Sequence, residues 1–567
     1  MSDLDNNPMK SGIVISLILI LSLGLNFYAI WWGLPSQSRN QLYYSGKSQI
    51  KSETDLITES MVTKSLTDGK SLPTSVYNPI RTYHPFEESI LKSVSNMNPC
   101  KLDFNPKYYF YGSLYIYLVA FFLGIGALLN ILTITTDIQF YFLHPFEMAK
   151  IYLVGRSLSA LLATMSVYLT YLIGKKIRGE GHGLLAAIIM AITPVFVINA
   201  HFLVPDVTMV FFVTLSFFFL VRILESDRMK YYILFGITSG LAGSSKYPGG
   251  LILFVLPLSF LIRDYSKQSL RKTRERSIIK KLLLTFLSAL LTFVILNPYM
   301  FFYSKKTGRV INIYLQQYGH IAQNFLSTLF SFVNLTRWGL SCPLLIISAL
   351  GLMLFIRQGK KSEKLAVIWI ALYYLFFALA KFQMVRYILP IVPFLALAGA
   401  FSILSICRWL KEKSLHWMLY LFTCMIIISL GWVFLYTVAF ENIMSGEIRT
   451  EAGRWISKNI PENSKIGMVR DPWQFEIPPL NKEKYRLVII NNAEQLAEKE
   501  CSYFIISDFQ QWSGMMEILR SHNSYIKIKE FEKCPCILGI SFPKGNPPHD
   551  WKYIYPTTTV FKRVKGE

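Results

Sequence analysis

Acidic and basic residues stand at the edges of long apolar runs in this chain, and together they could support group transfer from a phosphate leaving group. The candidate catalytic acids are Glu87, Glu88 and Asp206, and the candidate substrate-binding residues are His84, Arg156, His201, Lys246, Tyr247, Arg386 and Tyr387. A carboxylate can take the proton from an acceptor hydroxyl. Lysine and arginine can stabilise the charge that grows on a departing phosphate. Because ionisable groups at membrane depth are costly, such residues usually face one another or a water-filled cavity.

Each of these residues also has a purely structural explanation. Arg156, near the start of an apolar run, could extend its charge to lipid headgroups, and Asp206, which follows Pro205, could cap a helix. His84 and His201 could be hydrogen-bonded structural histidines. The other candidates could be interfacial turns or solvated surface acids. What favours a shared site is that all of them are predicted to lie on one side of a membrane.

Composition places the chain among polytopic membrane proteins. Of its 567 residues 52% are hydrophobic and 15% aromatic, and the mean hydropathy is +0.37. Apolar runs of about 17–25 residues recur, and each is long enough to cross a bilayer as a helix. The net charge of +23 comes largely from short loops between these runs, where basic residues orient helices and face anionic lipid. We therefore expect membrane lipid, and no nucleic acid, as a partner.

Charge in the loops predicts the topology. The expected apolar segments are 11–33, 114–133, 151–174, 183–200, 207–223, 231–245, 248–262, 282–298, 342–356, 364–380, 387–406 and 415–438. Basic loops at 175–178, 263–281, 357–364 and 408–413 are expected in the cytoplasm. These loops agree only if segment 114–133 lies in or re-enters the outer leaflet, or if residues 114–150 cross the membrane twice. The total is then 11 or 13 transmembrane helices. Residues 34–112 then form the first extracytoplasmic loop.

After about residue 440 the composition becomes that of a soluble domain. Short runs of strand-forming residues at 485–490 and 503–506 predict a small α/β domain. The sequence thus divides into a transmembrane catalytic domain, 1–440, and a soluble extracytoplasmic domain, 441–567. The second domain could bind an acceptor or cover a membrane cavity.

Several short sequence motifs follow one another along the chain. They are His84-Pro85-x-Glu87, Asn105-Pro106 with Tyr111-Gly112-Ser113-Leu114, Gly155-Arg156-Ser157-Leu158, His201-Phe202-Leu203-Val204-Pro205-Asp206, Gly240-Leu241-Ala242 with Lys246-Tyr247, and Arg386-Tyr387-x-x-Pro390-x-x-Pro393. In this order they resemble the GT-C glycosyltransferases. More narrowly, they resemble the dolichyl-phosphate-mannose protein mannosyltransferase family and its bacterial relatives, including undecaprenyl-phosphate aminoarabinose transferase. The likeness covers about 80–400 well and the C-terminal part weakly.

The resemblance implies an α-helical GT-C fold and a hexosyltransferase of the plasma membrane. Its donor would be a sugar on a polyprenyl phosphate, and its acceptor a hydroxyl on a protein, glycolipid or polysaccharide outside the cytoplasm. Transfer would invert the configuration at the anomeric carbon. By the same resemblance an acid of the first outer loop acts as base or orients the acceptor, Arg156 and Lys246 hold the phosphate, and Asp206 is a second acid.

The chain departs from the family at one position. The family typically has His-Pro-Asp-Glu, whereas Phe86 stands here in place of the aspartate. Either Glu87 or Glu88 replaces it, or the protein is an inactive member that acts as a binding subunit. Replacement is favoured, because two acids follow directly and the cations are retained. Two acids and a histidine could hold a divalent metal, which stays unassigned.

A transporter or flippase of lipid-linked sugars is the alternative from a different functional class. Transporters are commonly built from paired halves with broken helices, and no such internal repeat is visible in the sequence. A large outer loop and a soluble C-terminal domain fit the handling of an acceptor better. The sequence therefore favours the transferase.

Overall fold

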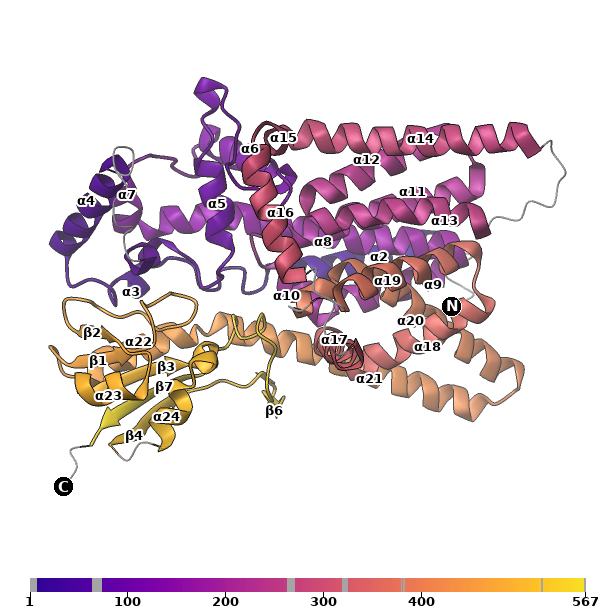
Figure 1. Cartoon of the computed structure of the whole chain (residues 1–567). Helices are drawn as coiled ribbons and strands as arrows, with labels where there is room; N and C mark the ends of the chain where they lie inside the picture. The colour runs from indigo at the N-terminus through magenta and orange to yellow at the C-terminus, as the bar shows by residue number, and fades with distance from the viewer. Residues whose placement is uncertain are drawn as a thin grey trace. The chain divides into compact units, whose positions relative to one another are not determined.

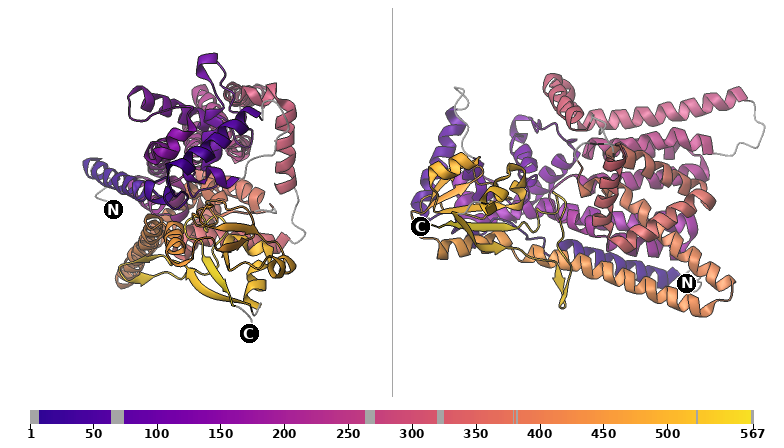
Figure 2. Two further views of the ribbon diagram at one scale, coloured as in Figure 1. Left: turned by 90° about the vertical axis from the view of Figure 1, so that its left-hand side faces the viewer. Right: turned by 60° about the horizontal axis from the view of Figure 1, so that its bottom comes forward.

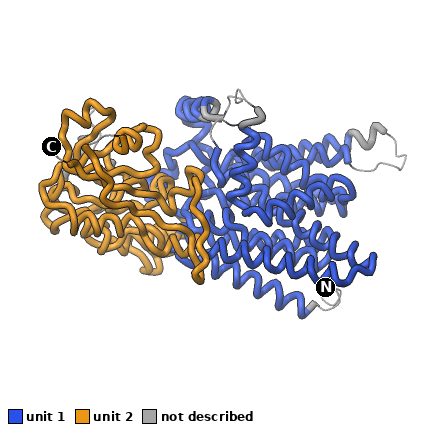
Figure 3. Tube along the Cα trace, turned by 90° about the horizontal axis from the view of Figure 1, so that it is seen from below, with its two compact units in different colours: residues 1–30, 90–120, 155–438 blue, residues 31–89, 121–154, 439–567 orange. Residues whose placement is uncertain are grey.

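The computed structural model describes residues 8–63, 74–262, 271–318, 325–378, 380, 383–521 and 524–564. These fall into two compact units, coloured separately in Figure 3. The helical unit comprises residues 1–30, 90–120 and 155–438, and the mixed unit comprises residues 31–89, 121–154 and 439–567. Residues 263–270 of the expected cytoplasmic loop lie outside the described part of the chain.

The helical unit contains most of the apolar runs. Its elements are α2 (Pro8–Phe27), α5 (Glu87–Ser95, shared with the mixed unit), η2 (Pro99–Lys101), α6 (Leu114–Leu128, shared), α8 (Pro145–Arg178, shared), α9 (Glu180–Ala191), α10 (Pro194–Ala200), α11 (Asp206–Ser226), α12 (Met229–Ser245), η3 (Tyr247–Phe254), α13 (Val255–Ile262), α14 (Arg271–Leu296), α15 (Pro298–Phe302), α16 (Ser304–Tyr318), α17 (Phe325–Leu340), α18 (Cys342–Gln358), α19 (Lys361–Ala378), η4 (Val385–Ile391), α20 (Val392–Glu412) and α21 (His416–Ser445, shared). Several begin with proline in the first turn, where a backbone N–H would have no helical partner.

The protein is a polytopic helical membrane protein, as predicted, but its candidate spans are fewer than the expected 11–13. Among the described residues six helices are long and apolar enough to cross a membrane, or up to eight if each bent pair is one span. The difference has a local cause. α9 and α10 meet at a 63° bend, and other expected spans are shorter apolar helices such as α6. Hydropathy registers an apolar run whether it forms one straight helix or a broken one.

Two glycines of α12 let it approach α14 closely. α11, α12 and α14 lie side by side (Figure 1). A Cβ atom at Gly236 of α12 would lie 2.4 Å from the carbonyl oxygen of Thr285, and one at Gly240 would lie 2.6 Å from that of Ala289. Glycine removes this clash and allows close backbone packing, as is common between transmembrane helices. This contact fixes the end of α12, which Lys246 directly follows.

The C-terminal part of the mixed unit is built around one five-stranded sheet. Its elements are α22 (Ile448–Asn459), β1 (Lys465–Met468), β2 (Arg486–Ile489), α23 (Ala493–Lys499), β3 (Tyr503–Ser507), η5 (Asp508–Ser513), α24 (Met515–Ser521), β4 (Tyr525–Phe531), the hairpin β5 (Cys536–Ile537) and β6 (Ile540–Ser541), and β7 (Thr558–Arg563). The strand order is β2-β1-β3-β7-β4 (Figure 1), and Figure 2 shows the strands from two further sides in yellow and orange. β1 pairs in parallel with β2 and β3, whereas β7 pairs antiparallel with β3 and β4. The predicted α/β domain and its two strand-forming runs are confirmed.

The expected first extracytoplasmic loop packs against this sheet domain within the same unit. Its elements are α3 (Gln37–Asn40), α4 (Lys47–Thr63), η1 (Thr74–Ile80) and, from the later segment, α7 (Ile138–Leu143). Ser75 donates from both its N–H and its hydroxyl to the Asp471 carboxylate, at 3.0 and 2.9 Å. Asn78 donates to the Pro472 carbonyl at 2.9 Å. The loop that carries Glu87 and Glu88 is therefore grouped with the C-terminal domain.

Candidate active site

The segment that leads to Glu87 is held by two buried arginines. Arg39 is fully buried and donates to the carbonyl oxygens of Gly33, Pro79 and Arg81, at 2.9, 3.0 and 2.6 Å. The Tyr83 ring lies 5.2 Å from the Arg39 guanidinium carbon and 4.8 Å from that of Arg449. Burial raises the pKa of Tyr83 above its ordinary value, and this neutral ring suits contact with two cations. The turn before His84 is thus fixed from both sides.

The two candidate acids of this loop differ in exposure. Glu87 is fully buried, and its Oε2 accepts a hydrogen bond from the Thr82 hydroxyl at 2.5 Å. Glu88 retains 29% of its side-chain exposure and pairs with Arg81 at 2.6 Å. Both stand in the first turn of α5, where a carboxylate interacts favourably with the helix dipole. Glu88 is therefore the more accessible of the two carboxylates.

His84 and Phe86 belong to an aromatic cluster of the mixed unit. His84 is buried, and its Nδ1 accepts from the Phe86 N–H at 3.3 Å. The Tyr553 ring lies 5.5 Å from the His84 ring and 6.4 Å from the Phe86 ring. Phe86 therefore fills an aromatic contact in the position where the family has an acid.

In the helical unit the structure joins Asp206 and Lys246 as a buried ion pair. The Lys246 ammonium lies 2.7 Å from Asp206 Oδ1, and the two side chains are 10% and 2% exposed. The same ammonium lies 5.3 Å from the centre of the Tyr111 ring and 5.7 Å from that of Tyr387. Arg386 is buried and directly precedes Tyr387 in η4. Four predicted site residues thus share one environment.

Backbone contacts around Tyr111 position this pair. A Cβ atom at Gly112 would lie 2.0 Å from the Ser244 carbonyl oxygen, so only glycine allows this contact with the end of α12. Asn297 accepts from the Ser113 N–H at 2.8 Å and donates to the Ser244 hydroxyl at 2.9 Å. The stretch Tyr111–Ser113 is thereby fastened to the turn that carries Lys246.

Tyr247 continues this hydrogen-bond network. Its hydroxyl donates toward the carbonyl oxygens of Tyr109 and Tyr111, at 2.7 and 3.0 Å. Tyr247 also begins η3, in which Gly249 lies against α12: a Cβ there would be 2.7 Å from the Ala242 carbonyl oxygen. Tyr247 accordingly positions the aromatic wall beside Lys246.

Arg156 and His201 converge on the turn that follows α2. Arg156 is fully buried and donates to the Ile30 carbonyl at 2.7 Å. The two ring nitrogens of His201 lie 2.8 Å from the Val197 carbonyl oxygen and 2.5 Å from that of Tyr28. Carbonyls beyond a helix C-terminus have no helical partner, so Arg156 satisfies one such group, and the single N–H of a neutral His201 ring can satisfy one more carbonyl. Both residues have a structural task at this turn.

The ten predicted residues therefore form three groups. Asp206, Lys246, Tyr247, Arg386 and Tyr387 lie together, Arg156 and His201 meet at the turn after α2, and His84, Glu87 and Glu88 belong to the mixed unit. Sequence reasoning did not single out Tyr111, Asn297 or Arg39 as site residues. Of these three residues only Tyr111 could have been found from the sequence, because it belongs to one of the motifs that carry the family resemblance. Among the described residues, no group of three or more His, Cys, Asp or Glu side chains could hold a metal ion.

Residues 149–299 match the family model described as dolichyl-phosphate-mannose-protein mannosyltransferase. The predicted resemblance to this family is therefore confirmed for a segment that contains Arg156, His201, Asp206, Lys246 and Tyr247. The chain is also 24% identical over 279 residues to an uncharacterised protein of Aquifex aeolicus (strain VF5). This alignment covers 49% of the chain and 53% of the relative, so it spans about half the length of the curated protein that it matches.

Solved structures that are similar to this chain include the following three. ArnT from Cupriavidus metallidurans bound to undecaprenyl phosphate is 12% identical, with 96% of this chain and 97% of that chain covered and a TM-score of 0.45. The oligosaccharyltransferase AglB from Archaeoglobus fulgidus, in complex with an inhibitory peptide and a dolichol-phosphate, is 12% identical, with coverages of 98% and 76% and a TM-score of 0.45. The S. cerevisiae protein O-mannosyltransferase Pmt1-Pmt2 complex bound to the sugar donor is 15% identical, with coverages of 53% and 34% and a TM-score of 0.31.

Proposed function

We propose that this protein is a membrane glycosyltransferase that moves a sugar from a polyprenyl-phosphate donor to an acceptor hydroxyl outside the cytoplasm, with inversion. The observation that carries the proposal is the buried Asp206–Lys246 pair, which lies inside the segment that matches the mannosyltransferase family. Burying two charges is costly, and replacing such a pair by apolar residues is often neutral or stabilising. Since stability alone does not require this buried pair, we infer that the Lys246 cation serves the reaction.

Lys246 is the residue that we assign to the donor phosphate. Its ammonium has three N–H donors, and Asp206 accepts one of them. The rings of Tyr111 and Tyr387 flank the ammonium and limit its hydration. In this role Lys246 stabilises the negative charge that grows on the phosphate oxygen as the glycosidic bond breaks. Arg386 adds a second positive charge to the same environment.

Glu88 is the acid that we assign to the acceptor. The acceptor oxygen attacks the anomeric carbon, the carbon–oxygen bond to phosphate breaks, and the phosphate leaves with the bonding electrons. The proton of the acceptor hydroxyl passes to a carboxylate. Glu88 suits this step better than Glu87 because its side chain is partly exposed, whereas Glu87 is buried against Thr82. In this assignment Glu87 shapes the loop that presents Glu88.

Mass spectrometry of envelope glycans tests the proposal without knowledge of the acceptor. Cells that produce the wild-type chain should carry a sugar modification that cells without it lack. Glu88→Gln should abolish this modification while leaving membrane insertion intact, and Glu494→Gln, a change of an exposed acid in α23, should leave it unchanged. Unaltered modification in the Glu88 variant would contradict the assignment of the acid.

A second measurement separates transfer from transport. Proteoliposomes loaded with undecaprenyl-phosphate-linked hexose should consume this donor when extracted envelope acceptors are added. Movement of labelled lipid-linked sugar across sealed vesicles, with no loss of donor, would contradict the transferase and favour a flippase. Failure of every variant and of the wild type to consume donor would favour an inactive binding subunit.

A further inference from the structure

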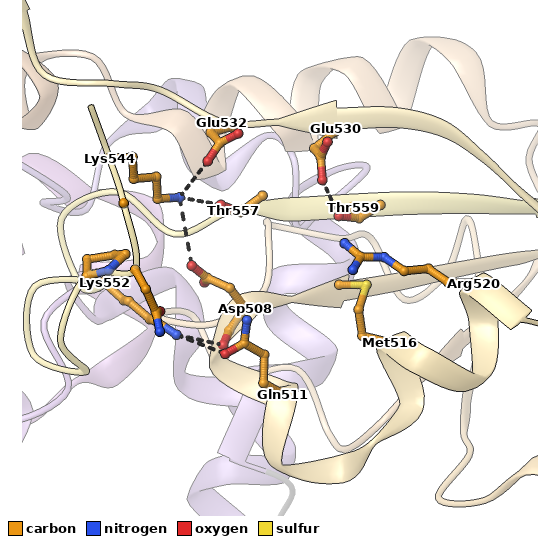
Figure 4. A pocket seen from close by; sticks show the side chains of 13 residues that line it. Asp508, Gln511, Met516, Arg520, Glu530, Glu532, Lys544, Lys552, Thr557 and Thr559 are labelled. Carbon is orange, nitrogen blue, oxygen red and sulfur yellow. Dashed lines mark hydrogen bonds and ion pairs between the residues drawn. The ribbon is translucent and has the colours of Figure 1, made fainter. Parts of the chain in front are cut away.

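A polar pocket lies in the C-terminal sheet domain, among residues that the proposed chemistry does not use. Its volume is about 300 Å³, and its lining comes from η5, α24, the end of β4, the start of β7 and the segment from Lys544 to Thr557 (Figure 4). All of these elements belong to the mixed unit. Such a volume is at the lower end of the range for small-molecule sites.

Two buried lysines form one wall of this pocket. Lys544 is 6% exposed and Lys552 is 8% exposed. The Lys544 ammonium bonds the Thr557 hydroxyl and lies 3.4 Å from Glu532 Oε1 and 3.8 Å from Asp508 Oδ2. The Lys552 ammonium donates to the Asp508 carbonyl at 3.2 Å and to the Gln511 side-chain oxygen at 3.3 Å. Lysine is almost never buried without such partners, so this part of the pocket is a built polar site.

Asp508 is the acid at the base of the pocket. It is 9% exposed, and its Oδ1 has no hydrogen-bond partner among the described residues. A buried carboxylate oxygen without a partner carries a desolvation cost that a ligand hydroxyl could relieve. Glu530 is already held by Lys527 and the Thr559 hydroxyl.

The rim carries groups that remain available for a ligand. Arg520 of α24 and Gln511 of η5 are both exposed and both line the pocket. In the described part of the chain no hydrogen bond or salt bridge involves the Arg520 guanidinium, which extends over Met516 in Figure 4. A guanidinium has five N–H donors. The rim therefore has N–H donors that can bind a ligand.

The charges of the lining balance. Arg520, Lys544 and Lys552 oppose Asp508, Glu530 and Glu532. An anion would meet the carboxylates at close range, and a cation would meet the ammonium groups. A hydroxyl group both donates and accepts hydrogen bonds, so a ligand with several hydroxyls can satisfy both kinds of lining group.

We propose that this pocket binds a neutral mono- or disaccharide unit of a glycan. The inference rests on the proposed function only for the identity of the ligand, which would be the glycan that accepts the sugar or the glycan product. Binding itself depends on the C-terminal domain alone. The pocket would retain the glycan by hydrogen bonds from Arg520 and Gln511 at the rim and to Asp508 at the base.

Saturation-transfer NMR on the full chain in nanodiscs tests the proposal, with methyl glycosides of hexoses and N-acetylhexosamines and their β-linked disaccharides as probes. At least one probe should show ring-proton saturation. Arg520→Ala should weaken its affinity about tenfold, the loss expected for a charge-assisted hydrogen bond. Arg486→Ala, which removes an exposed arginine of β2 outside the pocket, should leave the affinity unchanged.

Three outcomes would overturn the inference: no probe binds, Arg520→Ala and Gln511→Ala both bind as the wild type does, or inorganic phosphate binds in place of the glycosides. Asp508→Asn gives a further check because it keeps the shape of the side chain while changing its hydrogen bonding. It should also weaken glycoside binding. Glycoside binding by a chain that leaves envelope glycans unmodified would contradict the proposed function and leave this inference standing.

Discussion

Replacing Lys246 by methionine should destabilise the protein by about 3–5 kcal/mol, because it leaves the Asp206 carboxylate buried without its cation. The two charges are 2.7 Å apart and are 10% and 2% exposed. At an effective dielectric constant of about 20, their attraction is about 6 kcal/mol. Moving each ion out of water costs several kcal/mol. The intact pair is therefore nearly neutral in its net contribution, whereas either charge by itself is expensive.

The double variant Lys246→Met with Asp206→Asn separates stability from function. Because both charges are gone, its free energy of unfolding should lie within about 2 kcal/mol of the wild type, well above either single variant. Envelope-glycan modification should nevertheless be lost, because the double variant lacks the ammonium that we assign to the phosphate. Stability would be measured by SDS titration in mixed micelles, and modification by mass spectrometry.

A more exposed ion pair in the same unit supplies the matched control. Lys281 and Asp227 are 2.8 Å apart, but Asp227 is 43% exposed. Lys281→Met should therefore cost about 0–1 kcal/mol and leave modification intact. Additive losses in the Asp206–Lys246 double variant would refute the energetic reasoning. A double variant that modifies glycans as the wild type does would refute the role of Lys246 in binding phosphate.

Three further predictions concern other parts of the site and the sheet domain. Gly112→Ala should lower both folding yield and transfer, because its Cβ would lie 2.0 Å from the Ser244 carbonyl oxygen. Gly124→Ala should be neutral, because no heavy atom lies within 4 Å of the added Cβ. Fluorescence-detected chromatography would measure folding yield, and glycan analysis would measure transfer. Arg39→Met should cost about 3–5 kcal/mol, because it removes the guanidinium donor from the buried carbonyl oxygens of Pro79 and Arg81, while that of Gly33 keeps the Tyr83 N–H; equal SDS-unfolding curves for variant and wild type would contradict this. Burial raises the pKa of Asp508 above its ordinary 3.8, so the folded state binds more protons than the unfolded state and the free energy of unfolding falls as pH rises from about 4. Asp508→Asn should remove this part of the pH dependence, and an unchanged slope between pH 4 and 7 would contradict the assignment.

Local patterns in the sequence were enough to predict the main elements and several site residues. Runs of strand-forming residues predicted β2 and β3, and the change in composition near residue 440 predicted the sheet domain. The motifs that carry the family resemblance identified Asp206 and Lys246, which form an ion pair in the structure. These features are local: apolar periodicity and residue type decide them with little reference to the rest of the chain.

Tertiary structure decided what no local pattern contains. The number of spans depends on whether an apolar run stays straight, as α11 does, or breaks, as between α9 and α10. Arg156 and His201 contact carbonyl groups after α2, which no local pattern shows, because a helix end separated from them by more than a hundred residues packs there. Arg39 and Asn297 carried no signal, since their importance comes entirely from the backbone atoms that folding brings within hydrogen-bond distance. Residue type determined which groups could do chemistry, and long-range packing determined which groups each of them contacts.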